Sequence, residues 1–143
     1  MGGGVISSKE VGINHKEYGV TSLGVFKFVQ RALKEMGINS AKDPFTVKLT
    51  GGTNGDVAGN ALKLLLKHCP KVKILSITAG SGAAYDPEGI DKKELARLIL
   101  KKNIDELPPE SLHEGGFILY SREKRKEGFV DENKKVLKTK KGV

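Results

Sequence analysis

Apolar residues recur along the chain with two different periods, and each change of period marks a change of element. From Val20 to Met36 they recur every three to four residues, which is typical of one face of a helix. Thr21 and Ser22 are the candidate caps at its start, and Gly37 follows it as a C-terminal glycine. Residues Phe45–Thr50 alternate between apolar and polar side chains, so they predict a strand.

A second helix and a second strand follow a glycine-rich stretch. Apolar residues between Val57 and His68 form a helical stripe, and Pro70 ends it. The sequence KVKILSIT (residues 71–78) predicts the second strand. Turn-forming residues fill positions 79–89, which we therefore expect to form a loop.

The last periodic segments predict one more helix and one short element. Asp91 is placed to cap a helix over Lys92–Lys101, a loop follows over 105–116, and FILY (117–120) indicates a short strand or a helix end. Strands that alternate with helices favour a parallel α/β layer, but a complete dinucleotide domain needs about six strands in two halves. The sequence therefore predicts an α/β fold: an incomplete Rossmann-like three-layer unit, with a short parallel sheet flanked by helices.

Composition divides the chain into three parts: an irregular, glycine-rich segment 1–19, a partial Rossmann-like domain 20–120, and a basic tail 121–143. The formal net charge is +8, and the tail holds nine Lys or Arg against four Asp or Glu, a surplus of five. Because this charge is not organised on one face with interleaved aromatic residues, we do not expect nucleic-acid binding. A solvated, poorly ordered tail is the simpler interpretation.

Several other classes of function are disfavoured by the residues that are present. Cys69 is the single cysteine, so neither a disulfide framework nor a cysteine metal site is expected, and His68 beside it does not change this. No apolar run approaches the ~20 residues that cross a membrane. We expect a cytoplasmic protein, or a mitochondrial one if the parent is eukaryotic.

The sequence LTGGTNGDVAGN (Leu49–Asn60) places four glycines between the first strand and the second helix. A helix that begins at the carboxyl end of a strand presents free amide hydrogens and a positive dipole, which together bind a diphosphate. The residues from Gly52 to Ala58 read G-x-x-G-x-x-A, one residue longer between the first two glycines than the usual dinucleotide fingerprint. A tight turn without a ligand is the alternative interpretation.

A dinucleotide site also needs an acid at the end of the second strand, where it accepts hydrogen bonds from the ribose. The second strand ends at Ala79, and the next acid along the chain is Asp86. The residues alone therefore weaken the case for NAD.

Three longer motifs carry a family resemblance. INHKEYGVTSLGV (Ile13–Val25), DPFTVKLTGGTNGDVAGN (Asp43–Asn60) and YDPEGID (Tyr85–Asp91) resemble the cofactor domain of the large NAD-specific glutamate dehydrogenases, over residues 5–128. The resemblance implies NAD as cofactor and the oxidative deamination of glutamate to 2-oxoglutarate and ammonia. The family's catalytic residues belong to a separate substrate domain, so no catalytic residue is assigned to this chain.

The resemblance also implies where the cofactor would lie. The predicted NAD-contacting residues are Thr21 beside the nicotinamide, Gly52, Thr53, Asn54, Gly55, Asp56 and Val57 in the turn, and Ala79 and Ser81 at the adenosine ribose. Asp56 falls where relatives often carry Asn, and Ala79 falls where they commonly carry an acid. Ser81 is the residue that would partly replace that acid.

Two hypotheses follow. The chain is the first half of the cofactor domain of an NAD-dependent glutamate dehydrogenase and is inactive alone, its partners being NAD and either the rest of that polypeptide or another copy of itself. The alternative is a non-enzymatic, degenerate nucleotide-binding or assembly module of dehydrogenase ancestry.

Overall fold

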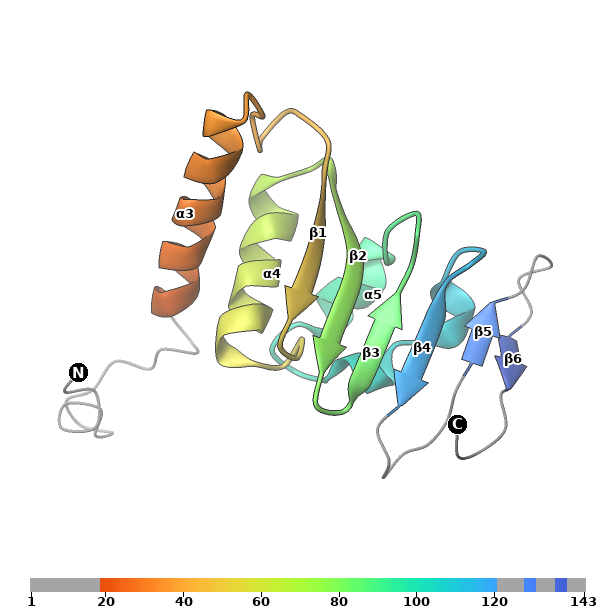
Figure 1. The fold of residues 1–143 in the computed structure, drawn as a ribbon. Coiled ribbons are helices and arrows are strands. Elements are labelled where there is room, and N and C mark those ends of the chain that lie inside the picture. Colours follow the sequence, from red (N-terminus) through yellow and green to blue (C-terminus); the bar gives the residue numbers. More distant parts are fainter. Residues whose placement is uncertain (1–18, 121–127, 131–135, 139–143) are drawn as a thin grey trace, which may run out of the picture.

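The computed structural model describes residues 19–120, 128–130 and 136–138. These residues form three α-helices, two short 3-10 helices and one six-stranded sheet (Figure 1). The elements are α3 (Val20–Glu35), β1 (Phe45–Thr50), α4 (Asp56–His68), β2 (Val72–Ala79), β3 (Gly82–Tyr85), α5 (Lys92–Leu98), η1 (Ile104–Glu106), η2 (Pro109–Ser111), β4 (Phe117–Tyr120), β5 (Gly128–Val130) and β6 (Val136–Lys138).

The sheet begins as a parallel pair and continues as antiparallel hairpins. Strand β1 pairs in parallel with β2, and α4 connects them as one β-α-β unit. Each later neighbour, from β2–β3 to β5–β6, is antiparallel. The carboxyl ends of β1 and β2 therefore meet at one edge of the sheet, where the glycine turn leads into α4.

The helices and the core lie on one side of the sheet. In the view of Figure 1, α4 and α5 lie behind the strands, and α3 packs against α4. Leu62 and Leu65 of α4 and Leu95 and Leu98 of α5 are buried in the core. The strands contribute buried side chains to the same core, namely Val72, Ile74, Ile77, Ala84 and Ile118.

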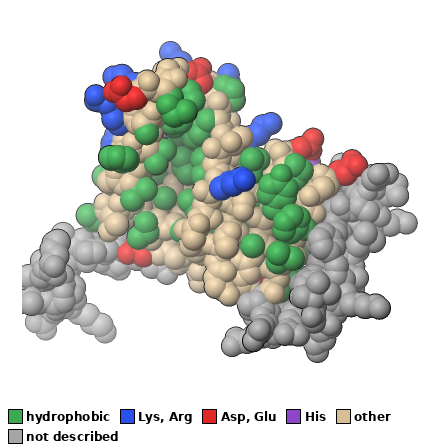
Figure 2. All heavy atoms as spheres, viewed as in Figure 1, with side chains coloured by type: hydrophobic (Ala, Val, Ile, Leu, Met, Phe, Trp, Pro, Cys, Tyr) green, Lys and Arg blue, Asp and Glu red, His purple; other side chains and the backbone are tan. Residues whose placement is uncertain are grey.

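The other face of the sheet carries exposed side chains, including Lys48 and Thr78. In Figure 2 the hydrophobic side chains on this side gather in separate groups, over α3 and over the β3–β4 part of the sheet. Exposed apolar residues of these elements include Phe28, which is 78% exposed, and Leu119. Among the described residues, the helical cover of the sheet is thus confined to one face.

An irregularity in β2 keeps its apolar side chains on the buried face. The register shifts between Val47 and Lys48 of β1, which pair with Ile74 and Ser76. One extra residue in β2 is a β-bulge, and it lets Ile74 and Ile77 face the same core although three positions separate them.

The α/β class, both parallel strands and the three helices predicted from the sequence are confirmed. The predicted loop 79–89 is wrong in part, because residues 82–85 form β3 and turn the sheet antiparallel. Helix α5 ends at Leu98 and not at Lys101, because Ile99 leaves the helical conformation and Leu100 has a φ of 60°. FILY is a strand, β4, and not a helix end.

Parts of the predicted terminal segments fall outside the described residues. The predicted irregular segment 1–19 is described only at Gly19. Within the predicted tail 121–143, two three-residue strands, β5 and β6, extend the sheet. Main-chain pairing of β5 with β4, and of β6 with β5, places these strands, which explains why sparse apolar residues did not reveal them.

We predict that Leu62→Ala lowers the free energy of unfolding by about 2–5 kcal/mol, because Leu62 is fully buried between helix and sheet and its loss leaves a cavity. Leu23→Ala is the matched control, since Leu23 on α3 is 47% exposed and should change stability by at most about 0.5 kcal/mol. Urea unfolding followed by circular dichroism measures both values. Equal losses for the two variants would contradict this packing.

Candidate dinucleotide-phosphate site

The turn from β1 into α4 is fixed to the end of β2. The amide of Gly51 donates to the carbonyl oxygen of Thr78 at 2.7 Å. Gly51 has a φ of 115°, a backbone conformation that residues other than glycine rarely adopt. A Cβ there would also lie 2.7 Å from the Cβ of Ala58. The chain can therefore reverse directly from strand to helix at this point.

The start of α4 offers unused main-chain donors. Gly55 is the N-cap in an extended conformation, without a side-chain cap, and its own amide donates to the carbonyl oxygen of Gly52 at 2.8 Å. Within the described residues, the amides at positions 52–54 and 56–57 donate to no backbone carbonyl group. Together with the helix dipole, these donors form the kind of cradle that binds a phosphate group.

Asp56 brings a negative charge to this cradle. It is the first residue of α4, where the helix dipole stabilises an acid. Its Oδ1 atom lies 3.4 Å from Nδ2 of Asn60, and the same Nδ2 donates to the carbonyl oxygen of Asp56 at 2.9 Å. The carboxylate therefore competes electrostatically with any anion that approaches the first turn.

Thr53 points into the protein. Its side chain is fully buried, and its hydroxyl group donates to the carbonyl oxygen of Lys102. Asn54, its neighbour in the turn, is exposed. Thr53 was among the turn residues predicted to contact NAD, but its side chain is turned inward and hydrogen-bonded within the protein.

Helix α3 brings Thr21 to the same edge of the sheet. Ser22 is buried and donates to the carbonyl oxygens of Val57 at 2.7 Å and Asp56 at 3.3 Å, which joins the first turns of α3 and α4. Thr21 beside it is exposed. Neither residue caps α3, because Gly19 is the N-cap in the left-handed conformation without a side-chain bond. No sequence signal distinguished Ser22 as the link between the two helices.

The end of β2 supplies the last predicted contacts. Ala79 pairs with Gly82 at the base of the β2–β3 turn, and Ser81 lies in that turn. The Oγ atom of Ser81 is buried and has no hydrogen-bond partner within the part of the chain that the structure describes. An unpaired buried hydroxyl group is costly, so a ligand hydroxyl that bonds to Ser81 would be stabilised here. This feature fits a ribose at the position that the sequence indicated.

Asp86, the next acid along the chain after β2, lies at the opposite edge of the sheet. It follows β3, and its amide donates to the carbonyl oxygen of Leu75 at 2.8 Å. Its fully buried carboxylate accepts from the amide of Glu88 at 3.0 Å, and from the amide and the Nδ1 atom of His113 at 2.9 Å each. This network joins the end of β3 to the loop before β4.

The other candidate reactive groups are held in packing roles. Cys69 is buried, and burial raises the pKa of its thiol. The His68 ring stacks against Phe26 with a centroid distance of 5.7 Å. Among the described residues, no three His, Cys, Asp or Glu side chains are grouped to hold a metal ion. None of the described helices is both long and apolar enough to span a membrane.

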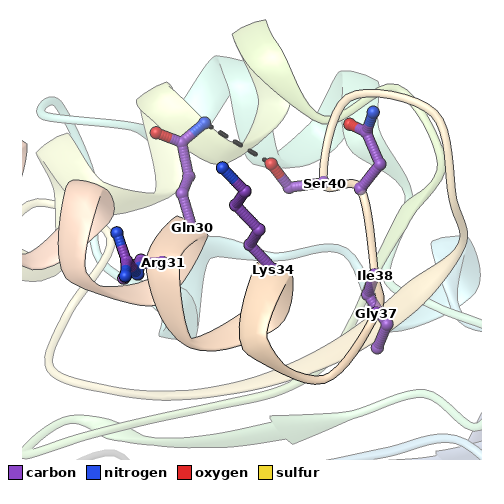
Figure 3. Close-up of a pocket in the computed structure, with 7 residues that line it drawn as sticks. Gln30, Arg31, Lys34, Gly37, Ile38 and Ser40 are labelled. Atoms are coloured by element: carbon purple, nitrogen blue, oxygen red, sulfur yellow. Dashed lines mark hydrogen bonds between the residues drawn. The ribbon is translucent and has the colours of Figure 1, made fainter.

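A surface pocket of about 570 Å³ lies at the other end of α3 (Figure 3). In it the amide group of Gln30 donates to the Ser40 hydroxyl at 3.4 Å, and Lys34 extends into the space between them. The pocket is lined by Gln30, Arg31, Lys34, Gly37, Ile38, Asn39 and Ser40. It is therefore separate from the edge that holds the glycine turn.

A β-α-β unit with an anion cradle at its first turn defines the nucleotide-binding class of α/β proteins. Residues 12–135 match the family model of glutamate/leucine/phenylalanine/valine dehydrogenases. The chain belongs to this family, which confirms the resemblance found in the sequence.

Individual relatives agree. The chain is similar to an NAD-specific glutamate dehydrogenase of Saccharomyces cerevisiae, with 38% identity over 110 residues, which are 76% of this chain and 10% of the relative. It is 31% identical over 133 residues to one of Mycobacterium tuberculosis, covering 87% of this chain and 8% of the relative. A crystal structure of Plasmodium falciparum glutamate dehydrogenase matches with a TM-score of 0.44 and 32% identity, over 57% of this chain and 16% of that one. The chain thus spans about a tenth of the length of these curated relatives.

We predict that Asp86→Asn lowers the free energy of unfolding by about 1–3 kcal/mol, because one amide nitrogen would face donors that now bond to a carboxylate oxygen. Glu88→Gln is the control, since the Glu88 side chain is 68% exposed. Thermal unfolding measures the difference. A stable Asp86→Asn variant would show that the network does not hold this edge.

Proposed function

We propose that this chain is the first half of the NAD-binding domain of an NAD-dependent glutamate dehydrogenase. The observation that supports the proposal is the set of amides at the start of α4, beside the end of β2, that donate to no backbone carbonyl group among the described residues. The parent enzyme would deaminate glutamate oxidatively to 2-oxoglutarate and ammonia, in the cytoplasm or, if eukaryotic, in mitochondria. When bound, NAD would supply the hydride acceptor.

Each part of the site has a separate task in this proposal. The amides of Gly52, Asn54 and Val57 would bind the diphosphate, and Gly55, whose own amide donates to Gly52, has no side chain and so lets the ligand approach closely. Ser81 would bond to the adenosine ribose, because its buried hydroxyl group has no hydrogen-bond partner among the described residues.

Two further parts of the site act at its borders. Thr21, exposed at the first turn of α3, would lie beside the nicotinamide. Ala79 would contact the ribose only by packing, because it has no polar atom beyond the main chain. The base that removes a proton from the substrate, and the groups that bind its carboxylates, would come from the rest of the polypeptide.

Calorimetric titration of the whole chain with NAD tests the cofactor role. We expect weak binding, with a Kd of about a millimolar. In the proposed function this chain supplies only the first half of the cofactor domain, and position 79 carries no acid to bind the ribose. No heat of binding at about 10 mM NAD would overturn the cofactor role of this chain.

Ala79 and the open face of the sheet favour a second candidate function, a degenerate nucleotide-binding or assembly module. Its partner would be the rest of a dehydrogenase polypeptide or another copy of this chain, since uncovered sheet surfaces promote association. Sedimentation velocity separates the candidates: self-association without any NAD binding supports the assembly module, and a monomer that binds NAD supports the cofactor domain.

Replacing Asp56 by Asn should tighten the binding of NAD about two- to fivefold, because a negative charge leaves the first turn of α4 where the diphosphate would bind. The gain should shrink at high salt, since added ions screen the repulsion. Glu88→Gln removes the same charge at the opposite edge and should leave the Kd unchanged. Calorimetry at two salt concentrations measures these effects, and weaker binding by Asp56→Asn would contradict the placement of the diphosphate.

Replacing Ala79 by Asp should tighten NAD binding about tenfold, because a carboxylate at the end of β2 would accept charge-assisted hydrogen bonds from the ribose. Inorganic pyrophosphate lacks a ribose, so its binding should weaken slightly in the same variant. Parallel titrations with both ligands provide the comparison. An equal change for the two ligands would show that position 79 does not face the ribose.

A further inference from the structure

The segment that follows α5 is bonded to the glycine turn. We infer that Thr53 is a positioning residue: it fastens the turn to the main chain at Leu100 and Lys102, and so presents the neighbouring amides to the diphosphate. The inference rests on the proposed cofactor role. It assigns Thr53 to the support of the site and not to contact with the ligand.

Two hydrogen bonds of opposite direction join Thr53 to the segment after α5, and we call this pair of bonds the latch. The amide of Leu100 donates to the carbonyl oxygen of Thr53 at 2.8 Å. The hydroxyl group of Thr53 donates in turn to the carbonyl oxygen of Lys102. Because Thr53 is fully buried, neither bond competes with water. The reciprocal pair fixes the orientation of Thr53 and hence of the peptide groups on both sides of it.

The end of α5 is shaped to form these bonds. Leu100 has a φ of 60° and is the only described residue other than glycine with a positive φ. Such a conformation is unfavourable for leucine, so surrounding contacts must hold it. The amides of Lys101 and Lys102 both donate to the carbonyl oxygen of Leu98, at 3.0 and 2.8 Å. This tight turn aims the Leu100 amide and the Lys102 carbonyl group at Thr53.

Two glycines make room for the latch. A Cβ on Gly59 would lie 2.5 Å from the carbonyl oxygen of Thr53 and 2.9 Å from Cδ2 of Leu100. A Cβ on Gly52 would lie 2.5 Å from Oδ1 of Asn103, the atom that accepts the amide of Ile104. All three distances are shorter than real Cβ contacts allow. These glycines therefore permit the turn to approach the segment that follows α5.

The latch explains how the turn accommodates its extra residue. The first two glycines of the usual fingerprint are separated by one residue, whereas Thr53 and Asn54 separate Gly52 and Gly55 here. Thr53 is turned inward and Asn54 outward. The amides that follow then keep their place at the start of α4, and a turn already ordered loses less entropy when it binds a ligand.

Thr53→Val and Thr53→Ser in the whole chain test the inference. Valine replaces the hydroxyl group with a methyl group of similar size, and serine keeps the hydroxyl group. Lys102→Ala is the matched control, because only the carbonyl group of Lys102 takes part. Hydrogen exchange of the Leu100 amide, followed by NMR without ligand, reports on the latch. Calorimetry with NAD and with inorganic pyrophosphate reports on the site.

We expect Thr53→Val to speed exchange of the Leu100 amide about tenfold and to weaken the binding of NAD and of pyrophosphate about tenfold each. Exchange and binding in Thr53→Ser and Lys102→Ala should stay near those of the original chain. Unchanged exchange in Thr53→Val would overturn the latch. Faster exchange with unchanged ligand affinity would overturn its positioning role. If the original chain binds neither ligand, the proposed function and this positioning role both fail, and the exchange data alone still decide whether the latch exists.

Discussion

The hydrogen bond from the Gly51 amide to the carbonyl oxygen of Thr78 fixes the point on which the site depends. It closes the parallel pair β1–β2 at its carboxyl end, so the chain must enter α4 within a few residues. Gly55, the N-cap of α4, has no side chain that could cap the helix. Among the described residues, the amides of the first turn therefore keep no cap, because the N-cap position is a glycine.

Local patterns were sufficient to predict β1 and α4, which form the corner of the structure around the glycine turn. The alternation of Phe45–Thr50 and the leucine stripe of α4 report directly on which side of each element is buried, and the core confirms both. The glycine turn between them was recognisable because its spacing follows from the geometry of a strand that leads into a helix. The edge of the sheet where the predicted contacts lie could therefore be identified without coordinates.

Long-range contacts account for what the sequence did not reveal. Strand β3 has the sequence GAAY and lies among turn-forming residues, and β2 and β4 pair with it on both sides. Asp86 is the next acid after β2 in the sequence, and the antiparallel return of β3 carries it to the opposite edge of the sheet. The bond between Ser22 and Val57 joins residues 35 positions apart, which no local pattern encodes.

The site is therefore built from main chain at its centre and from side chains only at its border. In the proposed function the amide donors would bind the phosphates, so a charge such as that of Asp56 would change the strength of binding without removing the donors. Recognition of a particular nucleotide would fall to the border of the site, where Ala79 has no charge and the Ser81 hydroxyl group has no hydrogen-bond partner among the described residues. A relative that carries an acid at position 79 would share this fold and this turn and still differ in its ribose contact. Divergence within the family can thus alter cofactor affinity at the end of β2 while the corner formed by β1 and α4 stays the same, because that corner is fixed by the Gly51–Thr78 bond and by the core beneath it.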